Sequence, residues 1–493
     1  AGLKALPWAE GLLIVRSSAL DEDGADGSKA GAYTSVLGVR IGDEFEGAVE
    51  RVVRSLGEGT GHQVLVQPQL ESVSASGVAF SRDPTTLAPC YVVNYETGSG
   101  ETTAVTSGAS GDLRTFIHAR HAPVPDDPHV GPVVRLLSEL SKLLDRDAID
   151  IEFGFDAGGD LYLFQVRPLV LPRQPEVDDD SYRRMLDLVA DRVSAGMRPS
   201  PFLCGKRTVY GVMPDWNPAE IIGVRPNPLA LSLYRDLVTD ATWAYQRNNY
   251  GYRNLRSFPL VVHFHGQPYV DVRVSFNSFV PADIRDGLAD RLVNYYIDRL
   301  VEQPHLHDKV EFDIIFSCYT PSTPKSVEVL GEYGFSREDI AALLASLKRL
   351  TNNIIHPERG HWRTDLAKLK TLDQRYQALA ASKVGMVERI YWLLEDCKRY
   401  GTLPFAGLAR AGFIAVQMLR SLRDLGIFSK YDYESFMINL NTVSSDLARD
   451  RSDLGRTAFL ARYGHLRPGT YDITSPRYDE APDLYFDWQD EDP

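Results

Sequence analysis

Residues 149–169, IDIEFGFDAGGDLYLFQVRPL, contain two alternating apolar runs separated by a turn that carries two glycines. The first run ends at Phe155, the second begins at Leu161, and the DAGGD interruption is typical of a hairpin turn. Side chains alternate between the two faces of a strand, so a hairpin folded about Gly158 and Gly159 fixes which residues share a face. We therefore predict an antiparallel hairpin here.

One face of this hairpin is expected to be polar. Symmetric folding places Glu152 opposite Gln165 and Asp150 opposite Arg167, all on the same face. A carboxylate and an amide oxygen suit Mg²⁺, whose shell is completed by waters and phosphate oxygens. Arginine can bind two phosphate oxygens at once. The pattern indicates either a magnesium and phosphate site or a solvated face with two ion pairs.

Composition narrows the class of protein. The 493 residues suffice for roughly two to four domains, and 53 basic against 67 acidic side chains give a net charge of −14, which argues against a nucleic-acid surface over the whole chain. The four cysteines lie far apart, without a CxxC motif, and predict a reducing compartment and no zinc site. No apolar run approaches the roughly 20 residues of a membrane helix. We expect a cytoplasmic protein with no nucleic-acid or membrane partner.

The N-terminal part predicts a mixed order of strands and helices. A short apolar strand at 12–15 leads into Arg16-Ser17-Ser18 and a loop rich in Asp and Gly. An arginine at a strand end, followed by glycines, can offer a charge-assisted contact and free backbone N–H groups to phosphate. The elements expected next are a helix at 45–56, strands at 64–70, 77–82 and 91–95, and a helix at 132–144.

Five motifs, in order, carry a family resemblance. They are VRSSALDED…AGAYTSVLGV, VLVQPQL, SGVAFSRDP, GSGE…SG and the 149–169 hairpin. Together they resemble the nucleotide-binding domain of the phosphoenolpyruvate synthase, pyruvate phosphate dikinase and rifampicin phosphotransferase superfamily, over residues 10–170. That domain has an ATP-grasp fold, so the resemblance implies ATP and Mg²⁺ as cofactors.

The resemblance also implies roles for single residues. Arg16 would contact the ATP phosphates, and Gly31, Ser35 and Val36 would form a loop of small residues over them. Gln67 would lie on the strand at the adenine side.

On the hairpin, the resemblance implies that Glu152 and Gln165 hold Mg²⁺ and that Arg167 holds phosphate. Arg16 and Arg167 would then be the catalytic cations. The hairpin pairing points to the same residues independently.

Two features of the family have no counterpart in this sequence. Members carry upstream the other half of the ATP-grasp domain, with a phosphate-binding lysine, and neither Lys4 nor Lys29 sits in a matching motif. Members also carry downstream a swivelling domain with a phosphoryl-accepting histidine, and none of the eleven histidines lies in such a motif. We expect both missing parts to act as partners from the same protein.

The expected fold class is α+β, in two domains. Residues 1–172 would be the C-terminal part of an ATP-grasp domain, 173–180 a linker, and 181–493 a mostly helical substrate-binding domain. The helices expected in the second domain cover residues 182–195, 337–350, 365–396, 405–425, 431–449 and 453–463.

Two polar stretches of the second domain are candidate substrate sites. The loop at 212–223 leads toward a helix from Leu229, and residues 269–277 alternate as in a strand with one polar face. The first could equally be a proline-stiffened connector and the second an exposed edge. The candidate substrate-binding residues are Asp215, Asn217, Glu220, Arg273 and Asn277.

Two further motifs bear on the reaction. ARYGHLRPGTYDITSPRYDE resembles the end of the helical domain of rifampicin phosphotransferase-like enzymes, and DWNPAEIIG looks closest to the L-glutamine kinases of capsule phosphoramidate biosynthesis. The resemblance implies a dikinase-type phosphotransferase that makes AMP, phosphate and a phosphorylated acceptor through a phosphohistidine, with the glutamine side-chain amide as acceptor. Alternatives are an antibiotic hydroxyl, pyruvate (disfavoured because no TIM barrel is present), or a non-catalytic nucleotide-binding or regulatory module.

Overall fold

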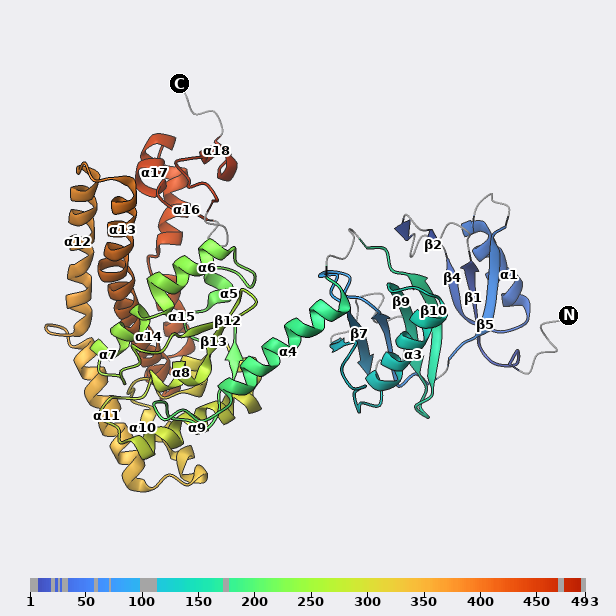
Figure 1. Ribbon diagram of the computed structural model, residues 1–493, viewed down its shortest axis with the longest axis horizontal. Coiled ribbons are helices and arrows are strands. Elements are labelled where there is room, and N and C mark those ends of the chain that lie inside the picture. Colours follow the sequence, from blue (N-terminus) through green and yellow to red (C-terminus); the bar gives the residue numbers. More distant parts are fainter. Residues whose placement is uncertain are drawn as a thin grey trace. The chain divides into compact units, whose positions relative to one another are not determined.

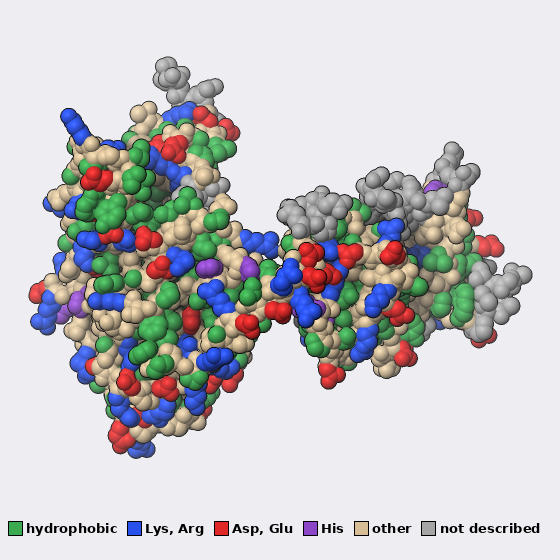
Figure 2. All heavy atoms as spheres, in the orientation of Figure 1, with side chains coloured by type: hydrophobic (Ala, Val, Ile, Leu, Met, Phe, Trp, Pro, Cys, Tyr) green, Lys and Arg blue, Asp and Glu red, His purple; other side chains and the backbone are tan. Residues whose placement is uncertain are grey.

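The computed structural model describes residues 8–18, 23–24, 27–28, 34–56, 61–70, 72–97, 113–171, 177–468 and 474–488. The chain forms two compact units, Ala1–Leu188 and Val189–Pro493, and the division falls inside helix α4 (Asp179–Gly196). The end of the predicted linker, 173–180, is helical, because α4 begins at Asp179. Residues 172–176 lie outside the described residues. Basic and acidic side chains are interspersed on the visible face of each unit (Figure 2).

Unit 1 contains a small sheet covered by one helix. Strand β1 (Leu13–Ser18) lies between β4 (Ser35–Val39) and β5 (Gln63–Pro68), and both pairings are antiparallel. Helix α1 (Asp43–Leu56) packs on one face, where its apolar residues meet Leu13 and Val15 in a buried cluster (Figure 1). The opposite face of this sheet carries no helix of the described residues.

A second, five-stranded sheet follows in the order β10-β9-β6-β7-β8, with every neighbouring pair antiparallel. Helix α3 (Val130–Leu143) covers one face (Figure 1). The strands are β6 (Ala75–Phe80), β7 (Cys90–Thr97), β8 (Arg114–Ala119), β9 (Ile149–Phe155) and β10 (Leu161–Pro168). Two short strands, β2 (Asp23–Gly24) and β3 (Gly27–Ser28), pair only with each other among the described strands.

The predicted hairpin is confirmed, with one irregularity. Glu152 lies opposite Gln165, and Asp150 lies opposite Arg167. Nearer the turn the register is one residue away from the symmetric expectation, and a bulge at Phe164 restores it. A Cβ atom at Gly154 would lie 2.7 Å from the Phe164 ring, so the glycine makes room for the bulged side chain.

Unit 2 is mostly helical, with one small sheet in the order β11-β13-β12. Its strands are β11 (Tyr210–Gly211), β12 (Val261–Phe264) and β13 (Gln267–Asp271). Its shorter helices are α5 (Pro218–Ile221), α6 (Pro228–Tyr234), α7 (Thr242–Asn249), α8 (Val272–Asn277), α10 (Thr323–Ser326), α15 (Lys430–Ile438), α17 (Arg456–Tyr463) and α18 (Pro482–Tyr485). Its longer helices are α9 (Asp286–Glu302), α11 (Arg337–Ile355), α12 (His361–Ala380), α13 (Met386–Asp396), α14 (Leu403–Asp424) and α16 (Val443–Asp453).

Several helix predictions for unit 2 are confirmed, and two are wrong in length. Helix α11 begins with the expected cap, because Ser336 and Asp339 exchange the two hydrogen bonds of a capping box. The helix predicted over 365–396 is two helices, α12 and α13, separated at 381–385. The helix predicted over 431–449 is likewise broken, because Thr442 forms a new capping box that starts α16.

The strand predicted over 269–277 is wrong beyond Asp271. Strand β13 ends at this residue, and its carboxylate accepts a hydrogen bond from Val274 N, 3.2 Å away, which caps α8. The residues of α8 are all buried, so the alternation in their sequence does not separate a wet face from a dry one.

One helical segment differs from the expectation about membranes. The continuous stretch Met386–Asp424, which joins α13 to α14 through the π-helical turn Cys397–Thr402, is long and apolar enough to cross a membrane by length and composition. Its most apolar window has a mean hydropathy of 1.3 and is 28% buried. Core helices of soluble proteins meet the same criterion, and Arg410 of α14 is 3% exposed and paired with Glu311 inside unit 2.

The packing of α3 leads to a stability prediction. Leu137 is fully buried against the large sheet, whereas Leu143 of the same helix is 76% exposed. Leu137→Ala should lower the free energy of unfolding of unit 1 by about 2–5 kcal/mol because it leaves a cavity. Leu143→Ala should change it by no more than about 0.5 kcal/mol. Urea unfolding measures both, and equal effects would contradict the placement of α3.

Candidate functional site

The polar face of the hairpin is built around the Arg167 guanidinium. Its Nε donates to Asp150 Oδ1 at 3.2 Å, and its Nη2 donates to Glu152 Oε1 at 2.9 Å. The three side chains are 15%, 20% and 25% exposed, respectively. They lie opposite α3, because Ile149 and the other inward residues of β9 fill the core beneath that helix. Two ion pairs on this face are what the sequence analysis kept open as the alternative to a magnesium and phosphate site.

A second guanidinium reaches this face from the other sheet of unit 1. Arg16 Nη2 donates to Gln165 Oε1 at 2.6 Å. Arg16 points away from α1, because Leu13 and Val15 alternate with it along β1 and are buried beneath that helix. The faces of the two sheets that carry no described helix therefore meet at this hydrogen bond, and Arg16, Glu152, Gln165 and Arg167 come together.

Gln67 lies on the same face as Arg16. It pairs with Ile14 across β1 and β5, and cross-strand partners point to the same side of a sheet. The structure thus places Gln67 on the same face of this sheet as Arg16, on the strand that the sequence predicts.

The loop expected over the phosphates is only partly where it was predicted. Ser35 and Val36 belong to strand β4, not to a loop, because their backbone pairs with β1. Val36 packs against the buried cluster under α1, which leaves Ser35, the cross-strand partner of Arg16, on the open face. Gly31 lies outside the described residues.

Two buried polar residues on the hairpin face were missed by the sequence reasoning. Ser76 is 1% exposed and Glu96 is 4% exposed, and they pair across β6 and β7. Val78 pairs with Glu152, so Ser76, two residues earlier, shares its face. Both residues have interaction partners in the protein. The sequence does contain a signal for a polar face on this strand: Asn94 and Glu96 stand at alternate positions of Cys90–Thr97, which is otherwise mostly apolar.

The residues of this face fit a magnesium ion. Glu152 and Gln165 present a carboxylate and an amide oxygen from opposite positions of two strands, and Mg²⁺ takes oxygen ligands together with waters and phosphate. The described residues contain no group of three or more His, Cys, Asp or Glu arranged to hold a metal. An ion here would therefore depend on phosphate oxygens as well as on the protein.

Asp215, a predicted substrate residue, is occupied inside unit 2. Its carboxylate accepts hydrogen bonds from Arg247 at 2.5 and 3.0 Å and from Ser275 Oγ at 2.6 Å. The side chains of Asp215 and Arg247 are 2% and 6% exposed. The Arg247 guanidinium also stacks on Phe279, 3.8 Å from the ring centroid. This carboxylate is part of a buried ion pair and is not free for a ligand.

The other predicted substrate residues do not converge on one pocket. Arg273, 5% exposed, donates to the backbone carbonyls of Arg198 and Gly196 at 2.8 and 3.1 Å. Asn277 donates to Cys204 O and accepts from Cys204 N.

Asn217 caps α5 by accepting a hydrogen bond from Glu220 N at 3.1 Å, and Glu220 itself is exposed. Arg273 was expected to face an anion from a strand. Because it lies in buried α8 instead, its guanidinium serves the backbone.

Comparison with protein families supports the nucleotide assignment. Residues 4–126 match the family model of the pyruvate phosphate dikinase AMP/ATP-binding domain. The match includes Arg16 and Gln67 and ends before the hairpin. It supports the resemblance to the phosphoenolpyruvate synthase and pyruvate phosphate dikinase superfamily, whose members are ATP-binding phosphotransferases. No curated protein matches the chain.

The burial of Asp215 gives a test of its role. Asp215→Ala removes the nearer carboxylate partner of the buried Arg247 and leaves only Glu311, 4.0 Å away. Breaking a buried pair costs about 3–5 kcal/mol of stability, and we expect a loss toward the lower end of that range. Glu220→Ala, at an exposed carboxylate of the same loop region, should cost at most about 0.5 kcal/mol. Thermal and urea unfolding measure the difference. An Asp215→Ala protein as stable as the parent would mean that the carboxylate is not structural.

Proposed function

We propose that this chain is the nucleotide-binding and acceptor-binding part of an ATP-dependent, dikinase-type phosphotransferase. The reaction converts ATP, an acceptor and water into AMP, phosphate and the phosphorylated acceptor, through a phosphohistidine on a domain outside this chain. The observation that carries the proposal is the hydrogen bond from Arg16, in the segment matched to an AMP/ATP-binding domain, to Gln165 on the hairpin. It joins two cations and two oxygen donors at one face, as phosphoryl transfer requires.

In this proposal the ATP phosphates lie at the junction of the two sheets of unit 1. Arg16 and Arg167 now donate to Gln165 and Glu152. With nucleotide bound, Arg16 and Arg167 would hold and position the phosphate oxygens, and the Glu152 carboxylate and Gln165 amide oxygens would hold Mg²⁺. The ion would supply neutralisation of the phosphate charge.

We further propose the side-chain amide of L-glutamine as the acceptor, on the resemblance of the DWNPAEIIG segment. An antibiotic hydroxyl and pyruvate are the alternatives within the class. Asp215 and Arg273 are already occupied within the protein, so the acceptor would bind elsewhere in unit 2.

A second candidate is a non-catalytic nucleotide-binding or regulatory module. The observation in its favour is that the matched family model, over residues 4–126, describes nucleotide binding alone. Both candidates require nucleotide binding in unit 1, and only the first requires turnover.

Nucleotide binding is tested by Glu152→Ala. The change removes one proposed metal ligand and should weaken Mg·ATP binding by at least about tenfold, the value of one charge-assisted interaction. Glu50→Ala, on the exposed surface of α1 in the same unit, is the matched control and should leave binding unchanged. Isothermal titration calorimetry measures both. Equal affinity for Glu152→Ala and the parent protein would exclude the hairpin as the nucleotide site.

Turnover is tested by phosphorus NMR of the complete protein, including its phosphohistidine domain, with Mg·ATP and L-glutamine. We expect AMP, phosphate and a new phosphoramidate signal, all dependent on glutamine. AMP formation without that signal would keep the dikinase reaction and exclude glutamine as the acceptor. Nucleotide binding with no turnover of any candidate acceptor would favour the binding module.

A further inference from the structure

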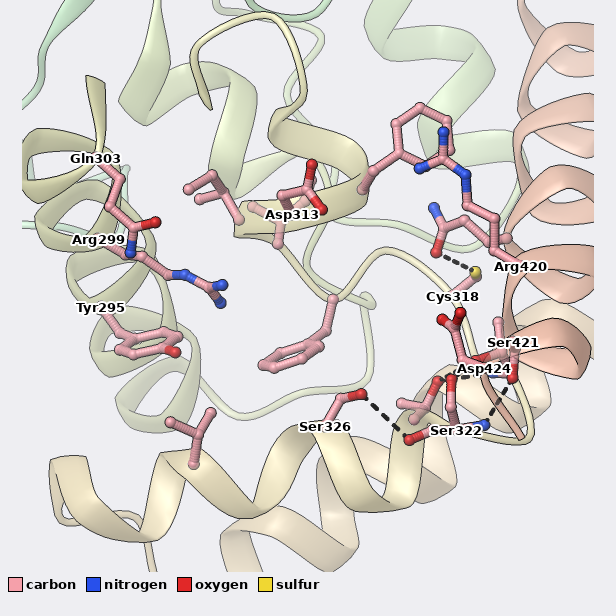
Figure 3. Close-up of a pocket in the computed structure, with 18 of the residues that line it drawn as sticks. Tyr295, Arg299, Gln303, Asp313, Cys318, Ser322, Ser326, Arg420, Ser421 and Asp424 are labelled. Atoms are coloured by element: carbon pink, nitrogen blue, oxygen red, sulfur yellow. Dashed lines mark hydrogen bonds between the residues drawn. The ribbon is translucent and has the colours of Figure 1, made fainter. Parts of the chain in front are cut away.

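Unit 2 contains a cavity of about 610 Å³, within the range of small-molecule sites. It lies between α9, the π-helical turn Val310–Ile314, α10 and the C-terminal half of α14 (Figure 3). None of the substrate residues predicted from the sequence lines it. Its lining carries three arginines and three acids: Arg299, Arg420, Arg423, Glu302, Asp313 and Asp424.

The charged residues of this cavity differ from the buried charges of unit 2 in how many of them form ion pairs. Arg423 is paired with Asp424 at 2.7 Å. In the part of the chain that the structure describes, the remaining two arginines and two acids of the lining form no ion pair. Deeper charges of the same unit are matched within the protein, as for Asp215 with Arg247. Glu302 and Asp313 are exposed and Arg299 and Arg420 are half-buried, so these four charges are accessible to a ligand.

One of the unpaired arginines lies over an aromatic ring, and the other lies at a tyrosine hydroxyl. The Arg420 guanidinium lies over Phe312, 4.3 Å from the ring centroid. Arg299 lies beside the hydroxyl of Tyr295; burial raises the pKa of that tyrosine, and the nearby guanidinium opposes the rise. Figure 3 shows Arg299 extending into the cavity from α9, Arg420 on the α14 side, and Asp313 between them. Both arginines are half-buried, whereas Asp313 is exposed.

The polar side chains of one wall of the cavity are held by hydrogen bonds, and its cysteine is unreactive. Gln417 Nε2 donates to Glu311 O at 3.0 Å, and its Oε1 accepts from Cys318 Sγ at 3.2 Å. Burial raises the pKa of Cys318 to about 12, so its thiol stays protonated and is not a nucleophile. The hydroxyl groups of Thr320 and Thr323 form a hydrogen bond of 2.9 Å with each other. This wall can shape a ligand site without reacting with the ligand.

We propose that this cavity binds a small zwitterion of the α-amino acid class, with its carboxylate at Arg299, which extends into the cavity, and its ammonium at Asp313. The unpaired charges of the lining, two positive and two negative, sum to zero. They therefore favour a ligand with both charges over a simple anion such as phosphate. The inference rests on the proposed function, for which it supplies the acceptor site and makes a free amino acid, such as L-glutamine, the acceptor class.

The experiment is isothermal titration of the whole 493-residue chain, without nucleotide, with L-glutamine and the other common amino acids. At least one of them should bind saturably. For the best binder, blocking the amino group by acetylation or converting the α-carboxylate to an amide should each weaken binding at least about tenfold. Inorganic phosphate should neither bind comparably nor compete.

Two variants locate the site. Arg299→Gln should weaken binding of the amino acid at least about tenfold but leave the affinity of its α-amide unchanged, because the α-amide lacks the charge that Arg299 contacts. Asp313→Asn should weaken the amino acid but not its N-acetyl derivative. Arg349→Gln, at an exposed arginine outside the cavity lining, is the control and should change nothing. Circular dichroism checks that each variant is folded.

Three outcomes would overturn the proposal: no amino acid binds, phosphate binds as well as the amino acid, or neither cavity substitution changes the affinity for the amino acid. Binding of an amino acid other than glutamine with the expected variant pattern supports the cavity and changes only the acceptor. Nucleotide binding is measured separately with Glu152→Ala. Loss of the nucleotide site with amino-acid binding retained would therefore overturn the proposed function and not the cavity, and the converse would overturn the cavity alone.

Discussion

The alternation of side chains along β9 is the constraint on which the nucleotide face depends. Ile149, Ile151 and Phe153 are buried under α3, and each such side chain contributes about 1.5–3 kcal/mol relative to exposure. A slip of one residue would drive Glu152 into that core, so the hydrophobic layer fixes the register of the polar face. The ion pairs of Arg167 are partly exposed and worth only about 0–1 kcal/mol each, in the range of surface pairs. The core beneath, more than the charges themselves, holds the site in place.

The dependence of the polar face on the hydrophobic layer explains which features of unit 1 could be predicted from the sequence. A period of two around a glycine turn is a local pattern, and it correctly paired Glu152 with Gln165. The bulge at Phe164 is not visible in that pattern, since it depends on the space over Gly154. The hydrogen bond from Arg16 to Gln165 spans 149 positions, and no spacing rule predicts it. The family resemblance brought these two residues together because it carries tertiary information that a local pattern lacks.

Predictions from local sequence patterns were wrong where every residue of a segment is buried. Residues 270–276 alternate apolar and polar side chains, which favours a strand with one wet face. In the structure Asp271 caps a helix whose residues are all buried, so the polar members of the pattern bond to backbone and to other buried groups. The predictions of single long helices over 365–396 and 431–449 were also wrong. The apolar spacing of these segments continues through breaks, and the second of these breaks is set by the cap at Thr442.

Charge pairing is the feature of unit 2 that the sequence could not supply, and it separates structural charges from available ones. Asp215 and Asp313 are the same residue type in polar segments. Asp215 is paired with Arg247, whereas Asp313 lines a cavity and forms no ion pair with any residue that the structure describes. The two environments are also connected. Glu311 pairs with Arg410 in the interior, and its carbonyl oxygen holds Gln417 in the cavity wall. Glu311 also lies 4.0 Å from Arg247, the partner of Asp215. Because one largely buried acid contacts Arg247, Arg410 and, through its backbone, Gln417, a substitution at the buried ion pairs should also alter the cavity wall.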